Sequence, residues 1–258
     1  MGKVAQNIIS KKVKEGTVAI FWLGQAGFVF KTSQGKIIYI DPYLTDSAEK
    51  VCGFKRLTPT VVEPYEVYAD WVIITHNHPD HLDIEAIPEI ARKGKTRFIG
   101  PPECMEKCYE LGVSKKQLVS IVEGDEREID GVYLTAVYAD HGDLAPEAIG
   151  IVLDFKIVKV YITGDTAYTP QKMNKVFSIK PEIIIPVING KFGNLNPEEA
   201  ALLTRDVQAK VAIPCHFWTF AEHNGDPLSF IEACKKEVPG VKVVLIKQGD
   251  CYIYENAL

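Results

Sequence analysis

Residues 71–81 of the chain read WVIITHNHPDH, and this stretch decides both the fold and the chemistry. Its first four residues are apolar without interruption, which predicts a short buried strand. Three of the six histidines in the chain follow almost at once, together with an aspartate. A solvated loop can also hold such residues, but half of all histidines at one strand end is typical of a metal site.

The geometry of this stretch offers two groups of ligands. In an extended backbone His76 and His78 point to the same side, because side chains alternate with a period of two. The turn imposed by Pro79 lets Asp80 and His81 face the same pocket from the other side. Such an arrangement suits two metal ions about 3.5–4 Å apart.

Other polar residues follow strand-like runs elsewhere in the chain: His141, Asp165 and His216. Active sites of layered α/β proteins gather where strands end. Taken singly, each residue also fits a hydrogen-bonded buried histidine or a turn aspartate. Together with the first cluster they complete a predicted metal site.

Composition excludes several functional classes. The chain has 258 residues, a formal net charge of −5, 47% hydrophobic residues and 24% charged residues. This balance argues against a basic nucleic-acid binder and against a disordered chain, and no apolar run reaches the ~20 residues of a membrane-spanning helix. The first residues lack the pattern of a secretory signal, so we expect a cytoplasmic protein with no nucleic-acid or membrane partner. The six cysteines form no CxxC pair, and Cys104 and Cys108 are expected as small buried residues of one helix.

Strand-like and helix-like patterns alternate along the chain, and Trp22 and Trp71 fall within expected strands and hence in the core. The expected strands cover residues 18–23, 27–32, 36–40, 70–75, 118–139 with a turn at 129–131, 148–155, 159–163, 183–188, 211–214, 241–246 and 251–254. The expected helices cover residues 83–92, 102–111, 196–210 and 226–236. No linker or repeat interrupts the pattern. We therefore predict an α/β (α+β) protein, a four-layered αββα sandwich, forming one domain over residues 1–258.

The pattern His-x-His-x-Asp-His at positions 76, 78, 80 and 81 resembles the metallo-β-lactamase superfamily. Further segments look like the branch that contains L-ascorbate-6-phosphate lactonase: residues 41–46, 53–57, 75–83, 164–168, 188–194, 216–220 and 224–227. Residues 217–219 are Phe-Trp-Thr, where that branch is expected to have a more acidic or methionine-containing stretch.

The resemblance implies a division of the ligands between two divalent metal ions, Zn²⁺ or Mn²⁺, with Fe²⁺ also accepted by the same ligands. One ion is held by His76, His78 and His141, the other by Asp80, His81 and His216, and Asp165 bridges the two. A carboxylate is expected behind one of the ligand histidines, with Asp41 and Asp83 as candidates and the resemblance favouring Asp41.

The resemblance implies the opening of a sugar-acid lactone that carries a phosphate, by a hydroxide held between the two metals. Asp80 orients or deprotonates the water and Asp165 is the second expected catalytic carboxylate. His223 is the candidate donor of a proton to the leaving alkoxide; a surface-loop histidine is the other interpretation.

An anionic small-molecule substrate needs positive or hydrogen-bonding groups. The adjacent Lys55 and Arg56 suit a phosphate dianion, although a solvated surface pair would look the same. Asn189, Lys191 and Asn194 lie in a loop that leads into a capped helix, whose amino end favours anions; ordinary turn chemistry explains them equally well.

Three other functions use the same residues. A phosphodiesterase with the same two-metal site is the main alternative. A di-iron redox protein normally carries a flavin-binding domain, for which 258 residues leave no room. A metal-stabilised scaffold without activity is the remaining one. A homo-oligomer is compatible with the sequence, which has no signature for or against it.

Overall fold

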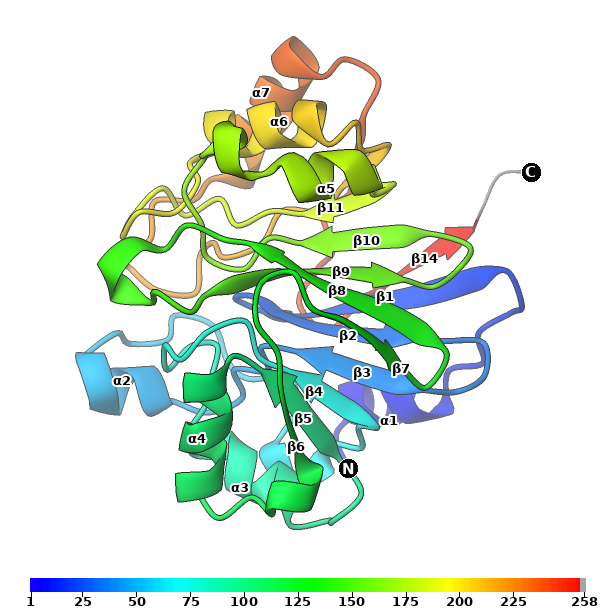
Figure 1. Cartoon of the computed structure of the whole chain (residues 1–258), viewed down its shortest axis with the longest axis vertical. Coiled ribbons are helices and arrows are strands. Elements are labelled where there is room, and N and C mark those ends of the chain that lie inside the picture. Colours follow the sequence, from blue (N-terminus) through cyan, green and yellow to red (C-terminus); the bar gives the residue numbers. More distant parts are fainter. Residues whose placement is uncertain (256–258) are drawn as a thin grey trace. The chain divides into compact units, whose positions relative to one another are not determined.

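The computed structural model describes residues 1–255. These residues form two compact units, one made of Met1–Ile121 together with the segment from Ile246 onward, the other of Val122–Leu245. Each unit contains one seven-stranded sheet with helices (Figure 1). The two units are described separately below.

The first unit has strand order β14-β1-β2-β3-β4-β5-β6. Its strands are β1 (Thr17–Gly24), β2 (Gly27–Lys31), β3 (Ile37–Ile40), β4 (Trp71–Ile73), β5 (Arg97–Gly100), β6 (Leu118–Ser120) and β14 (Cys251–Glu255). Its helices are α1 (Lys3–Ser10), α2 (Ser47–Cys52), α3 (Ala86–Ala91) and α4 (Pro102–Glu110). Pairing is antiparallel from β14 to β3 and parallel from β3 to β6.

One face of this first sheet makes a continuous core with the helices. Alternate strand residues such as Phe21, Tyr39 and Phe98 belong to the same buried cluster as Ile8 of α1 and Ile90 of α3. This alternation is the expected result of a sheet that packs helices on one side.

The parallel pairing of β3 with β4 positions the metal-binding stretch. Ile40 pairs with Ile73, and the amide of Asp41 donates to the carbonyl of Ile73 over 3.0 Å. The chain therefore leaves both strands at the same sheet edge, which brings Asp41 beside the residues that follow β4.

The second unit has strand order β13-β12-β11-β10-β9-β8-β7, antiparallel from β7 to β10 and parallel from β10 to β13. Its strands are β7 (Glu126–Ile129), β8 (Val132–Tyr138), β9 (Ile149–Asp154), β10 (Lys159–Ile162), β11 (Ile183–Ile185), β12 (Val211–Ala212) and β13 (Lys242–Val243). Its helices are α5 (Asn174–Ile179), α6 (Pro197–Asp206) and α7 (Pro227–Glu237).

Helices α6 and α7 begin where the sequence predicts. Asn196 accepts from the amide of Glu199, whose side chain accepts from the amide of Asn196, and Pro197 occupies the first helical position. The carboxylate of Asp226 accepts from the amides of Leu228 and Ser229. Both caps satisfy amides that a helix leaves without an internal partner.

The predicted α/β architecture with two sheets and helices is confirmed. The sequence does not predict helices α1, α2 and α5 or strand β5.

These elements are too short to show a clear hydrophobic period. Helix α1, for example, has only two fully buried residues, Ala5 and Ile8, over eight positions. Lys31 of β2 fixes this helix by donating to the carbonyls of Ile8 and Ile9. The single domain over residues 1–258 stays a prediction.

The smaller predictions about the core also hold. Cys104 and Cys108 are fully buried on α4, and Trp22 and Trp71 are 8% and 4% exposed.

Among residues 1–255, no helix has the length and apolar character needed to cross a membrane.

Candidate metal centre

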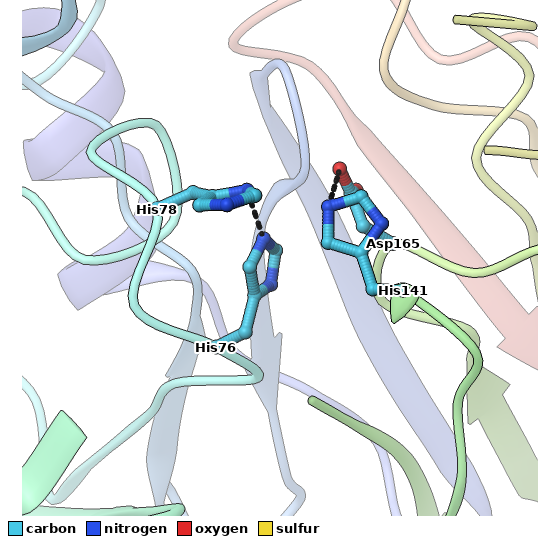
Figure 2. A group of neighbouring side chains, drawn as sticks. All are labelled: His76, His78, His141 and Asp165. Atoms are coloured by element: carbon cyan, nitrogen blue, oxygen red, sulfur yellow. Dashed lines mark hydrogen bonds and ion pairs between the residues drawn. The ribbon is translucent and has the colours of Figure 1, made fainter. Parts of the chain in front are cut away.

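The first ligand set consists of His76, His78, Asp80 and His81, on the loop that follows β4. The loop closes one turn, because the amide of His81 donates to the carbonyl of His78 over 3.0 Å. His76 and His81 are fully buried, and their ring centroids lie 4.1 Å apart. Nε2 of His76 faces Nδ1 of His78 at 3.0 Å (Figure 2). The ligand atoms of this set thus converge on one side of the loop.

Asp41 holds the first ligand set from behind. Its carboxylate accepts from the amide and the hydroxyl of Thr75 over 2.8 and 2.6 Å, and its Oδ2 lies 2.8 Å from Nδ1 of His81. A carboxylate against Nδ1 keeps the proton on that nitrogen and leaves Nε2 of His81 to bind a metal. Asp41, the candidate that the resemblance favours, therefore lies against His81; that His81 binds a metal stays a prediction. Asp41 adopts φ 42°, a left-handed conformation that aspartate tolerates better than most residues.

Asp83, the other candidate for supporting a ligand histidine, instead accepts hydrogen bonds from backbone amides and a hydroxyl. Its carboxylate accepts from the amides of Leu44 and Thr45 over 2.9 and 2.8 Å and from the Thr45 hydroxyl over 2.7 Å. It also accepts from the amide of Ala86 at the start of α3. Asp83 therefore ties the loop after β3 to this helix.

Gln25 is a site residue that sequence reasoning missed. It lies in the β1–β2 turn, is fully buried and adopts φ 50°. Its Nε2 donates to Oδ2 of Asp80 over 2.7 Å, and its own carbonyl accepts from Nε1 of Trp22. A hydrogen bond to one carboxylate oxygen orients Asp80 and leaves the other oxygen for a metal. The only sequence signal was a polar residue within the glycine-bearing turn at residues 24–27.

The second ligand set consists of His141, Asp165 and His216, which follow β8, β10 and β12 in the second unit. All three are nearly fully buried. Nε2 of His141 lies 3.7 Å from Oδ2 of Asp165, and Nε2 of His216 lies 3.3 Å from Oδ1 of the same residue (Figure 2 shows the first pair). Each carboxylate oxygen thus faces a different imidazole, an arrangement that suits a carboxylate shared by two cations.

Asn194 positions this carboxylate, because its Nδ2 donates to Oδ2 of Asp165 over 2.6 Å. The sequence predicted Asn194 as a substrate residue, and the structure places it next to the expected bridging ligand. Asn189 is fully buried in the same loop, and its carbonyl accepts from the amide of Asn224 over 3.1 Å. Lys191 is exposed.

His223 lies beside the second ligand set. Its ring stacks on that of His216 with centroids 4.6 Å apart and an interplanar angle of 18°. His223 is half-buried, so it can reach solvent on one side while contacting a candidate metal ligand on the other. Its role as proton donor stays a prediction.

His216 itself has a strained backbone. Its φ is 64°, a left-handed conformation that is uncommon for non-glycine residues and is concentrated at functional sites. The strand edge holds it there: the amide of Cys215 donates to the carbonyl of Pro186, and the carbonyl of Cys215 accepts from the amide of Ile188.

Lys55 and Arg56 differ sharply in their surroundings. Lys55 is exposed, whereas the Arg56 guanidinium is 5% exposed and lies 3.9 Å above the ring of Tyr43. Its Nη2 donates to the carbonyls of Tyr43 and Thr45. Burial raises the pKa of Tyr43 to about 12, against the opposing effect of the Arg56 charge, so the ring under the guanidinium stays neutral. Arg56 thus also shapes the loop after β3.

The two ligand sets fit divalent transition metals. Their ligand atoms are imidazole nitrogens and carboxylate oxygens, which suit Zn²⁺, Mn²⁺ and Fe²⁺. Ligand atoms lie within 4.8 Å of each other for His76 with His78, for Asp80 with His81 and for His141 with Asp165. A buried cluster of imidazoles and carboxylates is costly unless a cation or hydrogen bonds compensate it.

Residues 19–216 match the family model of the β-lactamase superfamily domain. The chain belongs to the metallo-β-lactamase superfamily. The matched residues include all seven candidate ligands, from His76 to His216.

Relatives in this superfamily carry a consistent description. The chain is 28% identical to the UPF0173 metal-dependent hydrolase of Polynucleobacter asymbioticus, over 92% of this chain and 86% of that one. Among solved structures it is similar to Igni18, a metallo hydrolase of Ignicoccus hospitalis, with TM-score 0.72, 23% identity and coverage of 93% and 99%. It also resembles a possible metal-dependent hydrolase of Veillonella parvula, with TM-score 0.76, 17% identity and coverage of 92% and 99%. The chain is accordingly a metal-dependent hydrolase of the metallo-β-lactamase fold, with a His/Asp cluster that can bind metal.

Proposed function

We propose that the two ligand sets together hold two divalent metal ions in one binuclear hydrolytic centre, with Asp165 shared between the ions. The observation that carries this proposal is the orientation of the Asp165 carboxylate, whose two oxygens face two different imidazoles. A second argument is ligand number. Each metal needs about four ligands, and neither set alone supplies enough for two ions.

The reaction we propose is hydrolysis of an ester or lactone bond. When bound, the metal pair lowers the pKa of a water molecule and stabilises negative charge on the attacked carbonyl oxygen. Asp80, oriented by Gln25, holds or accepts the proton of the attacking water. His223 donates a proton to the leaving alkoxide, because its ring lies against His216 and keeps access to solvent.

For the substrate we propose a lactone that carries an anionic group, a phosphorylated sugar acid in keeping with the lactonase-like resemblance. Lys55 supports the anionic group, since it is an exposed cation next to the loop that Arg56 and Asp83 shape. Asn189 supports a polar substituent, because its buried Oδ1 has no hydrogen-bond partner among the described residues. Zn²⁺ or Mn²⁺ is the proposed metal. A cytoplasmic location suits a chain with six cysteines, since thiols stay reduced there.

A substrate panel on metal-loaded protein tests this proposal. We expect turnover of a lactone 6-phosphate that falls on treatment with a chelator and returns with Mn²⁺ or Zn²⁺. Faster turnover of bis(p-nitrophenyl) phosphate than of any lactone would contradict it and favour a phosphodiesterase.

Lys55→Ala and Arg56→Ala separate binding of the anionic group from the structure of the loop after β3. Lys55→Ala should raise KM for the phosphorylated lactone by about tenfold and leave a neutral lactone unchanged. Arg56→Ala should impair the phosphorylated and the neutral lactone alike, because the Arg56 side chain is 5% exposed and donates to the carbonyls of Tyr43 and Thr45 in the loop after β3. If Lys55→Ala leaves both substrates unchanged, the anionic group is not bound by Lys55.

A further inference from the structure

Trp218 has an unusual environment for a large apolar residue. It lies two residues after the candidate ligand His216 and is 58% exposed, whereas Phe217, Thr219 and Phe220 are 5%, 2% and 1% exposed. Its backbone adopts φ 60°. For a bulky side chain this conformation is a genuine outlier, with a cost of order 1–3 kcal/mol.

The loop thus combines two unfavourable features in one residue. Exposing an indole forgoes the burial free energy that the same side chain would gain in the core. The left-handed backbone adds strain that a glycine would not have. Such a combination persists where the residue has a task beyond folding.

Phe192, on the loop before α6, has the same two features. It is 45% exposed with φ 55°. Its ring centroid lies 6.0 Å from that of His223, and the ring of His223 stacks on His216 at 4.6 Å. A row of rings therefore runs from an exposed phenylalanine to a candidate metal ligand.

The two aromatic loops are fixed to each other. The amide of Asn224 donates to the carbonyl of Asn189 over 3.1 Å. Gly225 packs so closely that a Cβ there would lie 2.9 Å from the carbonyl oxygen of Ile188 and 2.9 Å from Cβ of Phe217. These contacts join the loop that carries Phe192 to the loop that carries Trp218.

From these contacts we infer that Trp218 and Phe192 are substrate-contacting residues, and that the substrate bears an aromatic or alkyl group next to the hydrolysed bond. The inference rests on the proposed ester or lactone hydrolysis. It departs from the sugar-acid substrate proposed above in one respect, since it places an aromatic or alkyl group where a sugar acid carries hydroxyl groups. Exposed apolar rings on the loops of His216 and His223 gain free energy by covering a flat apolar group. The Phe-Trp-Thr sequence at 217–219 is the same departure from the lactonase-like branch noted above, and it favours a less polar acyl portion.

A fluorescence experiment tests contact without turnover. Trp218 is the exposed tryptophan of the chain, since Trp22 and Trp71 are buried, so acrylamide quenches mainly its emission. α-Phenylcyclopentanone, an unreactive ring ketone, should protect Trp218 in the metal-loaded protein, and cyclopentanone should not. Equal protection, or none, would overturn the inference.

A kinetic experiment uses Trp218→Gly, because glycine adopts φ 60° without strain and the loop should keep its fold. We expect KM for α-phenyl-γ-butyrolactone to rise by about tenfold and KM for γ-butyrolactone to stay within twofold. Leu228→Ala is the matched control, an apolar residue of α7 that is 63% exposed. It should change neither value.

The outcomes separate the two proposals. An equal rise in KM for both lactones would overturn the substrate contact, because it would show a general defect of the loop. Protection of Trp218 without hydrolysis of either lactone would support the contact and overturn the proposed ester or lactone chemistry.

Discussion

The two ligand sets differ in how the chain assembles them. The first set lies on one loop within residues 76–81, and Asp41 and Gln25 support it from neighbouring strand ends. The second set comes from three separate strand ends, and its three side chains meet at Asp165. A local turn therefore pre-arranges the first set, whereas the second depends on a complete sheet and on one shared carboxylate. The second set should be the more sensitive to a single substitution.

Asp165→Ala should have the largest effect. Removing the carboxylate leaves two cations with less negative charge between them and deprives both imidazoles of their common partner. We expect kcat/KM to fall by roughly 10³-fold or more, with metal content below two ions per chain by elemental analysis. Asp154→Ala, on the β9 side of a turn in the same unit, is the control. Two bound metals and normal turnover in Asp165→Ala would disprove a bridging role.

Asp41→Asn tests the support of the first set. Asparagine tolerates the left-handed backbone at this position but lacks the charge that orients His81. Loss of such a supporting carboxylate typically costs 10- to 100-fold in metal affinity or activity. Chelator titration followed by activity should show this weakening, with the circular dichroism spectrum unchanged. A variant with wild-type metal affinity would show that His81 needs no carboxylate.

The two ligand sets also differ in how well the sequence alone predicts them. The sequence predicts the first set because its ligands lie within six residues directly after an apolar strand. Asp41 is predicted from the resemblance. Residues 141, 165 and 216 were each ambiguous alone, since strand-end position does not reveal spatial convergence. Gln25 and Trp218 were missed because their roles depend on left-handed backbone, which a sequence signals only when the residue is glycine or asparagine.

Gln25→Asn should have a smaller effect than Asp41→Asn. Asparagine accepts φ 50° but is too short to keep the 2.7 Å hydrogen bond to Asp80. Because Asp80 retains its charge, we expect kcat to fall by about three- to tenfold while two metals stay bound, consistent with the loss of one charge-assisted hydrogen bond. Loss of a metal would instead mean that Gln25 governs ligation and not orientation.

Asp226→Ala should have the smallest effect, and it should change only the free energy of unfolding. It caps α7, directly after the loop that carries His216. Hydrogen bonds from the Ser229 hydroxyl and amide hold the pKa of its carboxyl below the ordinary value. The stabilisation is therefore complete above about pH 4, the ordinary aspartate pKa, and is lost as pH falls through the lower value of the folded state. Asp226→Ala should lower the free energy of unfolding by about 0.5–2 kcal/mol at pH 7 in urea titrations, and by less at pH 2.5. An equal loss at both pH values would show that the charge of Asp226 does not contribute.

The claim that both ligand sets form one two-metal centre is tested most directly by electron paramagnetic resonance of the protein loaded with Mn²⁺. Two ions about 3.5–4 Å apart and bridged by Asp165 should give an exchange-coupled spectrum at two Mn²⁺ per chain, and Asp165→Ala should abolish the coupling. An isolated six-line Mn²⁺ spectrum at full loading of the wild-type chain would contradict the claim.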